Sequence, residues 1–243
     1  MLFHAVLLPI LVGLPPPPTA EPAADAQVES ILVRYLQATR EQLSYLRDVT
    51  MDVEMEGTLP NLKKTGRMHA LRTISRFGLI TYRALTFQGD NTIKKDVIAR
   101  YMQAETEAVT GNTGLAITPE NYKFKYRGLF GSGDWQLHLF ELSPKKKRLG
   151  LFKGFLWLHA STCLPVREQG EFVKNPSIFL RKITFIRDYE IRTGVAVPWR
   201  IESTIETRLV GKAQLSIQYS NYVKPESSVA TDTALSPRVP DSR

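Results

Sequence analysis

The residue types that most often carry out chemistry are few and scattered in this sequence. Three histidines follow the N-terminal segment, namely His69, His138 and His159. None of them stands in an HxH or HExxH pair or beside a carboxylate at metal-ligand spacing. Cys163 is the single cysteine, which excludes an intramolecular disulfide and a cysteine-based zinc site. It sits in STCLP between two predicted strands, which favours a packed or turn cysteine over a catalytic thiol.

Common nucleophile and phosphate-binding motifs are also missing. Gly131-Ser132-Gly133 reads as a turn and not as a GxSxG elbow. No Walker loop is present, and no GxGxxG lies between a strand and a helix. No pair of acids stands out as an acid/base dyad. We therefore expect a protein that is not an enzyme and that carries no metal or cofactor; a hydrolase, which would need a polar cluster inside a cleft, is the third alternative.

The charge pattern argues against a nucleic-acid partner. The net charge is +8, and 43% of the residues are apolar, which is enough for a buried core. The basic residues are interleaved with acids on predicted strand faces, as in RIESTIETR (200–208). No aromatic-studded basic groove, zinc knuckle or helix-turn-helix pattern appears. The KKKR cluster (145–148) at a predicted hairpin tip favours a solvated turn over a docking site.

The N-terminal segment predicts export. Ala5 to Leu14 is an apolar run too short to span a bilayer. Ala24-Asp25-Ala26 has the small-x-small form that signal peptidases cut, so we expect a signal peptide over 1–26. No cysteine follows the apolar run, so we expect an exported, periplasmic protein without a lipid anchor. The domain itself is predicted over 27–223, and 224–243 is predicted to be a disordered tail because its periodicity is lost.

Apolar periodicity predicts one α+β domain. A helix is expected from about Val28 to Arg47, and a second one follows the N-cap signal Gly89-Asp90-Asn91 and ends before Gly111. Period-two alternation predicts strands elsewhere, joined by short turns as in an antiparallel meander. The first strand is expected to break at Gly57. The strand candidates are 49–56, 65–74, 78–87, 115–118, 121–128, 134–142, 148–158, 164–173, 178–188, 197–209 and 212–223.

Large apolar side chains alternate along several of these strands and would gather on one concave face of a curved sheet. Such a face is either filled by side chains or left open for a ligand, and the sequence leaves both open. The second helix would cover it as a lid, through Ile93, Val97 and Tyr101. The predicted ligand-facing residues are Met51, Val53, Met55, Trp135, Leu137, Leu139, Trp199, Ile201, Ile205, Leu215, Ile217 and Tyr219.

Two turn motifs give the chain a family resemblance. Residues 159–167 read HASTCLPVR, similar to a D-x-x-T-x-L-P-x-R turn with His159 in place of the acid. Gly194 to Pro198 gives G-x-x-x-P before two closing strands. With the predicted order of elements, residues 27–223 resemble the periplasmic lipoprotein-carrier superfamily, the LolA/LolB-like fold. The resemblance implies an unclosed half β-barrel with helices over its mouth, which holds acyl chains on its concave face.

Two functions follow from this resemblance. The first is a monomeric periplasmic carrier for a lipid, a lipoprotein acyl chain or another hydrophobic ligand, in transient contact with a membrane surface or an envelope protein. The alternative is a protein-interaction or envelope-stress regulatory module with a filled core and no ligand.

Overall fold

The computed structural model describes residues 21–111, 115–175, 178–208 and 211–224. These residues form one antiparallel sheet of ten strands, in the order β3-β2-β1-β10-β9-β8-β7-β6-β5-β4. The strands are β1 (Val49–Leu59), β2 (Lys64–Ile74), β3 (Ile80–Gly89), β4 (Tyr122–Phe130), β5 (Leu137–Pro144), β6 (Phe152–His159), β7 (Pro165–Phe172), β8 (Leu180–Arg192), β9 (Val195–Thr207) and β10 (Lys212–Val223). The predicted tail and most of the predicted signal peptide lie outside the described residues, so both boundaries stay predictions.

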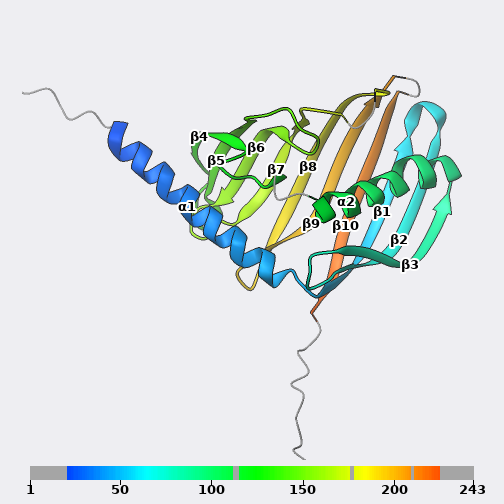
Figure 1. Cartoon of the computed structure of the whole chain (residues 1–243), viewed down its shortest axis with the longest axis horizontal. Coiled ribbons are helices and arrows are strands. Elements are labelled where there is room, and N and C mark those ends of the chain that lie inside the picture. Colours follow the sequence, from blue (N-terminus) through cyan, green and yellow to red (C-terminus); the bar gives the residue numbers. More distant parts are fainter. Residues whose placement is uncertain (1–20, 112–114, 176–177, 209–210, 225–243) are drawn as a thin grey trace, which may run out of the picture.

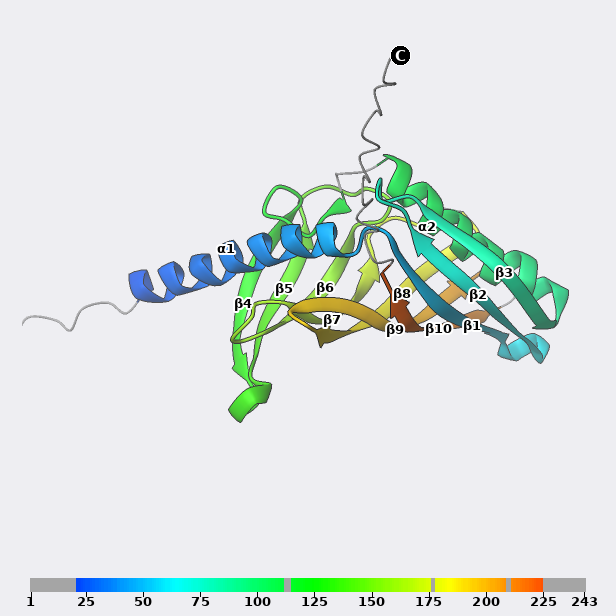
Figure 2. The same ribbon diagram turned by 90° about the horizontal axis from the view of Figure 1, so that it is seen from below.

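The topology is a meander joined to its own beginning. Strands β4 to β10 each pair with the next strand along the chain, and β10 then pairs with β1. Strands β3 and β4 are the two edges of the sheet and do not pair with each other within the described residues. The sheet curves strongly but stays open (Figures 1 and 2). The predicted α+β half barrel is confirmed.

Two helices cover the concave face at opposite ends of the sheet. Helix α1 (Glu21–Tyr45) lies over β4–β6, and helix α2 (Ala99–Gly111) lies over β1–β3 (Figure 2). A π-helical turn, η2 (Ile93–Ile98), leads into α2. The predicted N-cap is confirmed, since the Thr92 backbone N–H donates to Asp90 Oδ1 at 2.7 Å. No helix within the described ranges is both long and apolar enough to cross a membrane.

Side chains on the concave face form two separate apolar clusters. The α2 cluster joins η2 and α2 to β1, β2, β9 and β10, and its buried members are Val49, Met51, Val53, Met55, Leu59, Met68, Ala70, Ile93, Val97, Ile98, Ile201, Ala213, Leu215, Ile217 and Tyr219. The α1 cluster joins α1 to β4–β8, and its buried members are Ile31, Tyr35, Tyr122, Phe140, Leu142, Leu151, Phe152, Leu156, Leu158, Cys163 and Phe185. The curved sheet therefore has two cores, each under its own helix.

The sequence predicts that the first strand breaks at Gly57, and this prediction is wrong. Gly57 pairs with Leu215 on one side and Gly66 on the other, and β1 continues to Leu59. A Cβ atom at Gly57 would lie 2.7 Å from Ile93 Cγ2. The glycine is needed because η2 approaches the sheet closely at this point, which is a tertiary contact that strand propensity does not reveal.

The predicted strand over 115–118 is also wrong. This segment forms turns, in which the Thr118 N–H donates to the Ala116 carbonyl at 2.9 Å. Leu115 and Ile117 pack on the α1 cluster from these turns, so burial and not strand pairing explains the apolar run. The KKKR stretch lies exposed between β5 and β6, where the sequence predicts a turn.

Candidate functional site

The structure brings most of the predicted ligand-facing residues together beneath the predicted lid. They lie in the α2 cluster, against Ile93, Val97 and Tyr101. This group comprises Met51, Val53, Met55, Ile201, Ile205, Leu215, Ile217 and Tyr219. Met51, Val53, Met55 and Ile217 expose 1% or less of their surface, so this part of the concave face is filled by side chains and helix. That these residues contact a ligand stays a prediction.

Trp135, Leu137 and Leu139 do not belong to the concave face. On β5 the buried side chains are His138, Phe140 and Leu142, while the other set points to the outer face. Trp135 lies in the 3-10 turn η4 (Gly133–Trp135) ahead of the strand and is 76% exposed. Both faces of β5 carry large apolar residues, so alternation alone does not identify the inner one.

Trp199 is likewise outside the cluster. The register between β8 and β9 shifts here, since Asp188 pairs with Arg200 and Tyr189 pairs with Pro198. Trp199 is the extra residue of this β-bulge and is 40% exposed. The bulge interrupts the alternation that begins at Ile201, so extending the pattern back to Trp199 gives the wrong orientation.

A strip of the concave face lies between the two clusters, along β8 and β9. Four of its inward-facing side chains, Ile183, Arg187, Ser203 and Ile205, are only partly buried, whereas Phe185 and Ile201 between them are buried in the α1 and α2 clusters. On β10, the strand beside β9, the inward side chains Leu215 and Ile217 are buried, and on β7, the strand beside β8, Glu168 is buried while Phe172 is only partly buried. We call Ile183, Arg187, Ser203 and Ile205 the central strip. It is a part of the concave face that the two clusters leave partly exposed.

A polar group beside the strip ties α2 to the sheet. The Arg72 guanidinium on β2 donates from Nε and Nη2 to the Glu105 carboxylate on α2, at 3.3 and 3.0 Å. Tyr82 on β3 also donates its hydroxyl to Glu105. Burial and the Glu105 carboxylate raise the pKa of Tyr82, so the phenol stays protonated and remains a donor.

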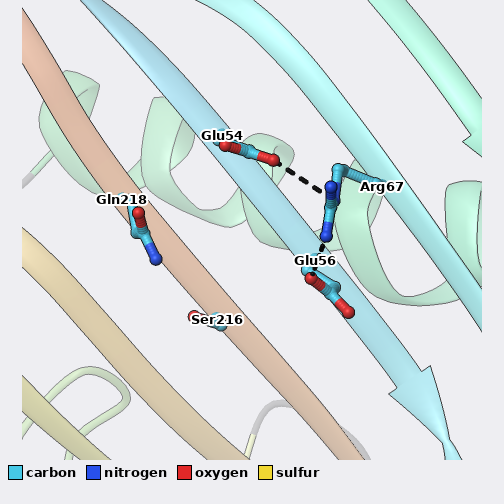
Figure 3. Close-up of a pocket in the computed structure, with 5 residues that line it drawn as sticks. All are labelled: Glu54, Glu56, Arg67, Ser216 and Gln218. Carbon is cyan, nitrogen blue, oxygen red and sulfur yellow. Dashed lines mark hydrogen bonds and ion pairs between the residues drawn. The ribbon is translucent and has the colours of Figure 1, made fainter.

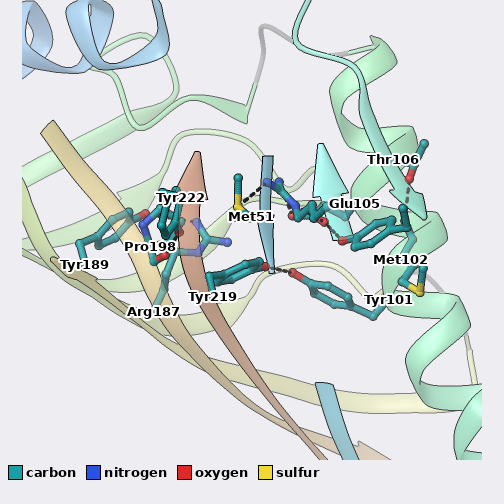
Figure 4. Close-up of polar contacts among 12 residues, drawn as sticks. Met51, Tyr101, Met102, Glu105, Thr106, Arg187, Tyr189, Pro198, Tyr219 and Tyr222 are labelled. Carbon is teal, nitrogen blue, oxygen red and sulfur yellow. Dashed lines mark hydrogen bonds and ion pairs between the residues drawn. The ribbon is translucent and has the colours of Figure 1, made fainter. Parts of the chain in front are cut away.

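Two tyrosines extend this connection (Figure 4). The hydroxyls of Tyr101 on α2 and Tyr219 on β10 lie 3.2 Å apart, and the Arg72 guanidinium lies 5.6 Å from the centre of the Tyr219 ring. Burial raises the pKa of Tyr219 to about 12. Helix α2 is thus held by apolar contacts through η2 and by a polar group farther along, which we call the α2 latch: Arg72, Tyr82, Tyr101, Glu105 and Tyr219.

A second ion pair, of which only the carboxylate is buried, lies in the middle of the concave face. Arg187 Nη1 on β8 donates to Glu168 Oε2 on β7 at 3.1 Å, and the Tyr189 hydroxyl donates to Glu168 Oε1 at 2.8 Å. Glu168 is 6% exposed. Burial, followed by the Glu168 charge, raises the pKa of Tyr189, which keeps this hydroxyl a donor as well. The ion pair lies at the boundary of the two clusters, and its arginine belongs to the central strip.

Sequence analysis missed both ion pairs. Each arginine occupies an inward position within an apolar alternation: Met68, Ala70 and Arg72 on β2, and Ile183, Phe185 and Arg187 on β8. A charged residue in register with a buried apolar face is itself a signal, because burial of a charge requires a partner. The partners Glu105 and Glu168 come from other elements and have no comparable signal.

Two hollows of the surface lie on the opposite, outer face. One, of about 280 Å³, is lined by Glu54, Glu56, Arg67, Ser216 and Gln218, and Arg67 bridges the two carboxylates at 3.2 and 2.9 Å (Figure 3). A shallower groove of about 590 Å³ crosses β5–β9 and includes Phe155, Gln169 and Ile186. These side chains face away from both clusters, which agrees with the solvated outer face that the sequence predicts.

His138, His159 and Cys163 have contacts that are typical of structural residues. His138 Nδ1 lies 3.0 Å from the Tyr126 hydroxyl, and His159 Nε2 lies 3.0 Å from the Asp134 carbonyl oxygen. Cys163 is fully buried in the α1 cluster, and burial raises the pKa of its thiol. Among the described residues, no three His, Cys, Asp or Glu side chains come close enough together to hold a metal ion.

Comparison with known proteins gives structural likenesses only. No protein-family model matches the chain, and no curated protein sequence does. Similar solved structures include a DUF1329 family protein from Desulfovibrio piger, with a TM-score of 0.44 and 14% identity over 85% of this chain and 95% of that chain. A LolA superfamily protein from Nitrosomonas europaea gives 0.39 and 15% over 82% and 93%. A putative outer membrane lipoprotein-sorting protein domain from Vibrio parahaemolyticus gives 0.42 and 11% over 79% and 92%.

The last two structures are named after the lipoprotein-carrier superfamily that the sequence resembles. All three TM-scores are below 0.5, so these likenesses carry no conclusion about what the chain binds.

Proposed function

We propose that the protein is an exported, periplasmic binding protein that holds a lipid, a lipoprotein acyl chain or another hydrophobic ligand on the concave face of its sheet. The observation that carries this proposal is the central strip. Ile183 and Ile205 pair across β8 and β9 and stay partly exposed between the two buried clusters, with Ile205 packed at the margin of the α2 cluster. An apolar surface left open between two cores is where an acyl chain would gain most from leaving water.

Helix α2 is the element that would move to admit the ligand. The cluster beneath it contains Met51, Met55 and Met68, with Met102 of α2 packed against it. Methionine side chains are flexible and fill irregular spaces, so this cluster can repack around a chain that replaces part of the helix contact. The α2 latch would reseat the helix over the bound ligand. The signal peptide expected over 1–26 supports the periplasmic location.

A disulfide between α2's leading turn and the sheet tests the lid directly. A Cβ built at Gly57 lies 3.7 Å from Val97 Cβ, within the range of about 3.5–4.5 Å found in disulfides. The variant is Gly57→Cys/Ile93→Ala/Val97→Cys, in which Ile93→Ala removes the methyl group that crowds Gly57. Its oxidised and reduced forms share every packing change, so each is the control for the other.

Binding is measured by native mass spectrometry after export in a bacterium and by uptake of a fluorescent fatty acid. We expect a lipid adduct and probe uptake for the unmodified chain, loss of uptake in the oxidised variant, and recovery on reduction. Equal uptake by both forms would show that α2 is not the lid. An unmodified chain with neither adduct nor uptake would mean a filled core, and the protein-interaction module would then be the better account.

A further inference from the structure

The two inward-facing arginines of the concave face differ in how many of their nitrogens have a hydrogen-bond partner. The Arg72 side chain is 9% exposed. Its Nε and Nη2 atoms donate to Glu105, and Nη1 lies 3.4 Å from Met51 Sδ. All three nitrogens therefore have a partner. Arg72 is a structural residue of the α2 latch, with no nitrogen left without a partner.

Arg187 has donors to spare. The Arg187 side chain makes two hydrogen bonds, and Nη1 is the donor in both. The acceptors are Glu168 Oε2 at 3.1 Å and the Tyr189 hydroxyl at 3.5 Å. Nε and Nη2 have no hydrogen-bond partner among the residues that the structure describes. The side chain is 38% exposed although it lies on the inner face, so these two nitrogens are accessible from the concave side. They form the edge of a guanidinium that binds a carboxylate or phosphate through two parallel hydrogen bonds.

The surroundings fix this edge in place. Glu168 is buried and accepts from both Arg187 and Tyr189, so the carboxylate holds the far end of the guanidinium. The guanidinium carbon also lies 5.8 Å from the centre of the buried Phe185 ring. Arg187 pairs with Ile201, which is part of the α2 cluster. A positioned cation at the margin of an apolar surface suits a ligand that is apolar along its length and anionic at one end.

The apolar part of such a ligand has a path beside it. Ile183 lies on the same face of β8, four residues from Arg187, and therefore about 13 Å away along the strand. Ile205 pairs with Ile183, so the far end of the central strip is apolar. We propose that Arg187, positioned by Glu168, binds the anionic head group of an acyl-chain ligand whose chain runs along the central strip toward Ile183 and Ile205. This inference rests on the proposed function and names the ligand class.

The test compares ligands that differ only in their head group, each below its micelle-forming concentration. Palmitate carries a carboxylate, lysophosphatidate carries a phosphate, and hexadecanol carries no charge. The inner variant Glu168→Gln/Arg187→Gln removes both charges while keeping polar side chains. The matched control is Arg167→Gln/Asp188→Asn, which removes an ion pair of 2.6 Å on the outer face of the same two strands, one residue away.

We expect the unmodified chain to bind at least one anionic ligand roughly tenfold or more tightly than hexadecanol, as hydrogen bonds to a charged group imply. The inner variant should lose this preference while still binding hexadecanol, and the outer variant should keep it. Arg187→Lys, which leaves Glu168 paired, should retain only part of the preference because it lacks the two-donor edge. Whether palmitate or lysophosphatidate binds more tightly distinguishes a carboxylate from a phosphate head group.

The possible failures separate the two proposals. If hexadecanol and both anions bind equally to the unmodified chain and to the inner variant, the head-group site is overturned and the proposed function stands. If the outer variant loses the preference to the same extent as the inner one, general charge and not Arg187 is responsible. If no ligand binds the unmodified chain, both proposals fall together.

Discussion

At the scale of single residues, the α2 latch depends on a charge pair that is costly to break. Arg72 and Glu105 come from different elements, and both side chains are largely removed from water, at 9% and 19% exposed. Tyr82 adds a further donor to the same carboxylate. A buried pair of this kind contributes little relative to a well-packed apolar pair, yet the loss of one partner leaves the other charge without compensation.

We predict that Arg72→Ala lowers the free energy of unfolding by about 3–5 kcal/mol, because Glu105 keeps its desolvation cost and loses its cation. The double variant Arg72→Met/Glu105→Leu should cost clearly less than this single change. Urea unfolding at neutral pH measures both. A double variant that is as unstable as Arg72→Ala would show that packing around Arg72, and not the unpaired charge, sets the cost.

At the scale of elements, the close approach of η2 to the sheet depends on glycines in β1 and β2. A Cβ at Gly57 would lie 2.7 Å from Ile93 Cγ2, and one at Gly66 would lie 3.0 Å from the same atom. Ile93 is fully buried at this contact. The two adjacent strands thus form a shallow seat for one side chain, and this seat sets the height of the helix above the sheet.

We predict that Gly57→Ala destabilises the protein by roughly 1–3 kcal/mol through overpacking against Ile93. In an Ile93→Ala background the same substitution should be close to neutral, because the clashing methyl group is gone. A double-mutant cycle by thermal unfolding measures the coupling between the two positions. Additive effects would contradict the steric explanation and would point instead to the loss of glycine's flexibility in the strand.

Elements also show what the sequence reveals and what it does not. Strands such as β1 and β10 were predictable because large apolar residues alternate with polar ones, and short turns then required an antiparallel order. The orientation of β5 was not predictable from the sequence, because β5 carries large apolar residues on both faces, such as Leu137 on one and Phe140 on the other. The bulge at Trp199 and the partners of Arg72 and Arg187 arise from contacts between strands and helices that are distant in the sequence, and single-strand periodicity contains no information about them.

At the scale of the whole molecule, the concave face combines two apolar cores with a boundary rich in tyrosine. Tyr101 and Tyr219 meet between α2 and β10, and Tyr189 binds Glu168 nearby. Tyr122 is a buried member of the α1 cluster, with 1% of its surface exposed. Burial raises the pKa of Tyr219 and of Tyr122 from 10.0 to about 12. The state of these hydroxyls therefore links both cores to pH.

We predict that the fold loses stability above about pH 10. Unfolded tyrosines release their protons near this pH, while Tyr219 and Tyr122 keep theirs until about pH 12 in the folded chain. The folded state then binds more protons than the unfolded state, so the free energy of unfolding falls as the pH rises through this window and is unaffected by these groups below it. Urea unfolding across the window, with tyrosinate absorbance on the folded protein, measures the effect. Tyr219→Phe should make the free energy of unfolding fall less steeply with pH, because the ring still packs but no longer carries a proton that can be released. An unchanged pH dependence would show that other groups cause the loss of stability at alkaline pH.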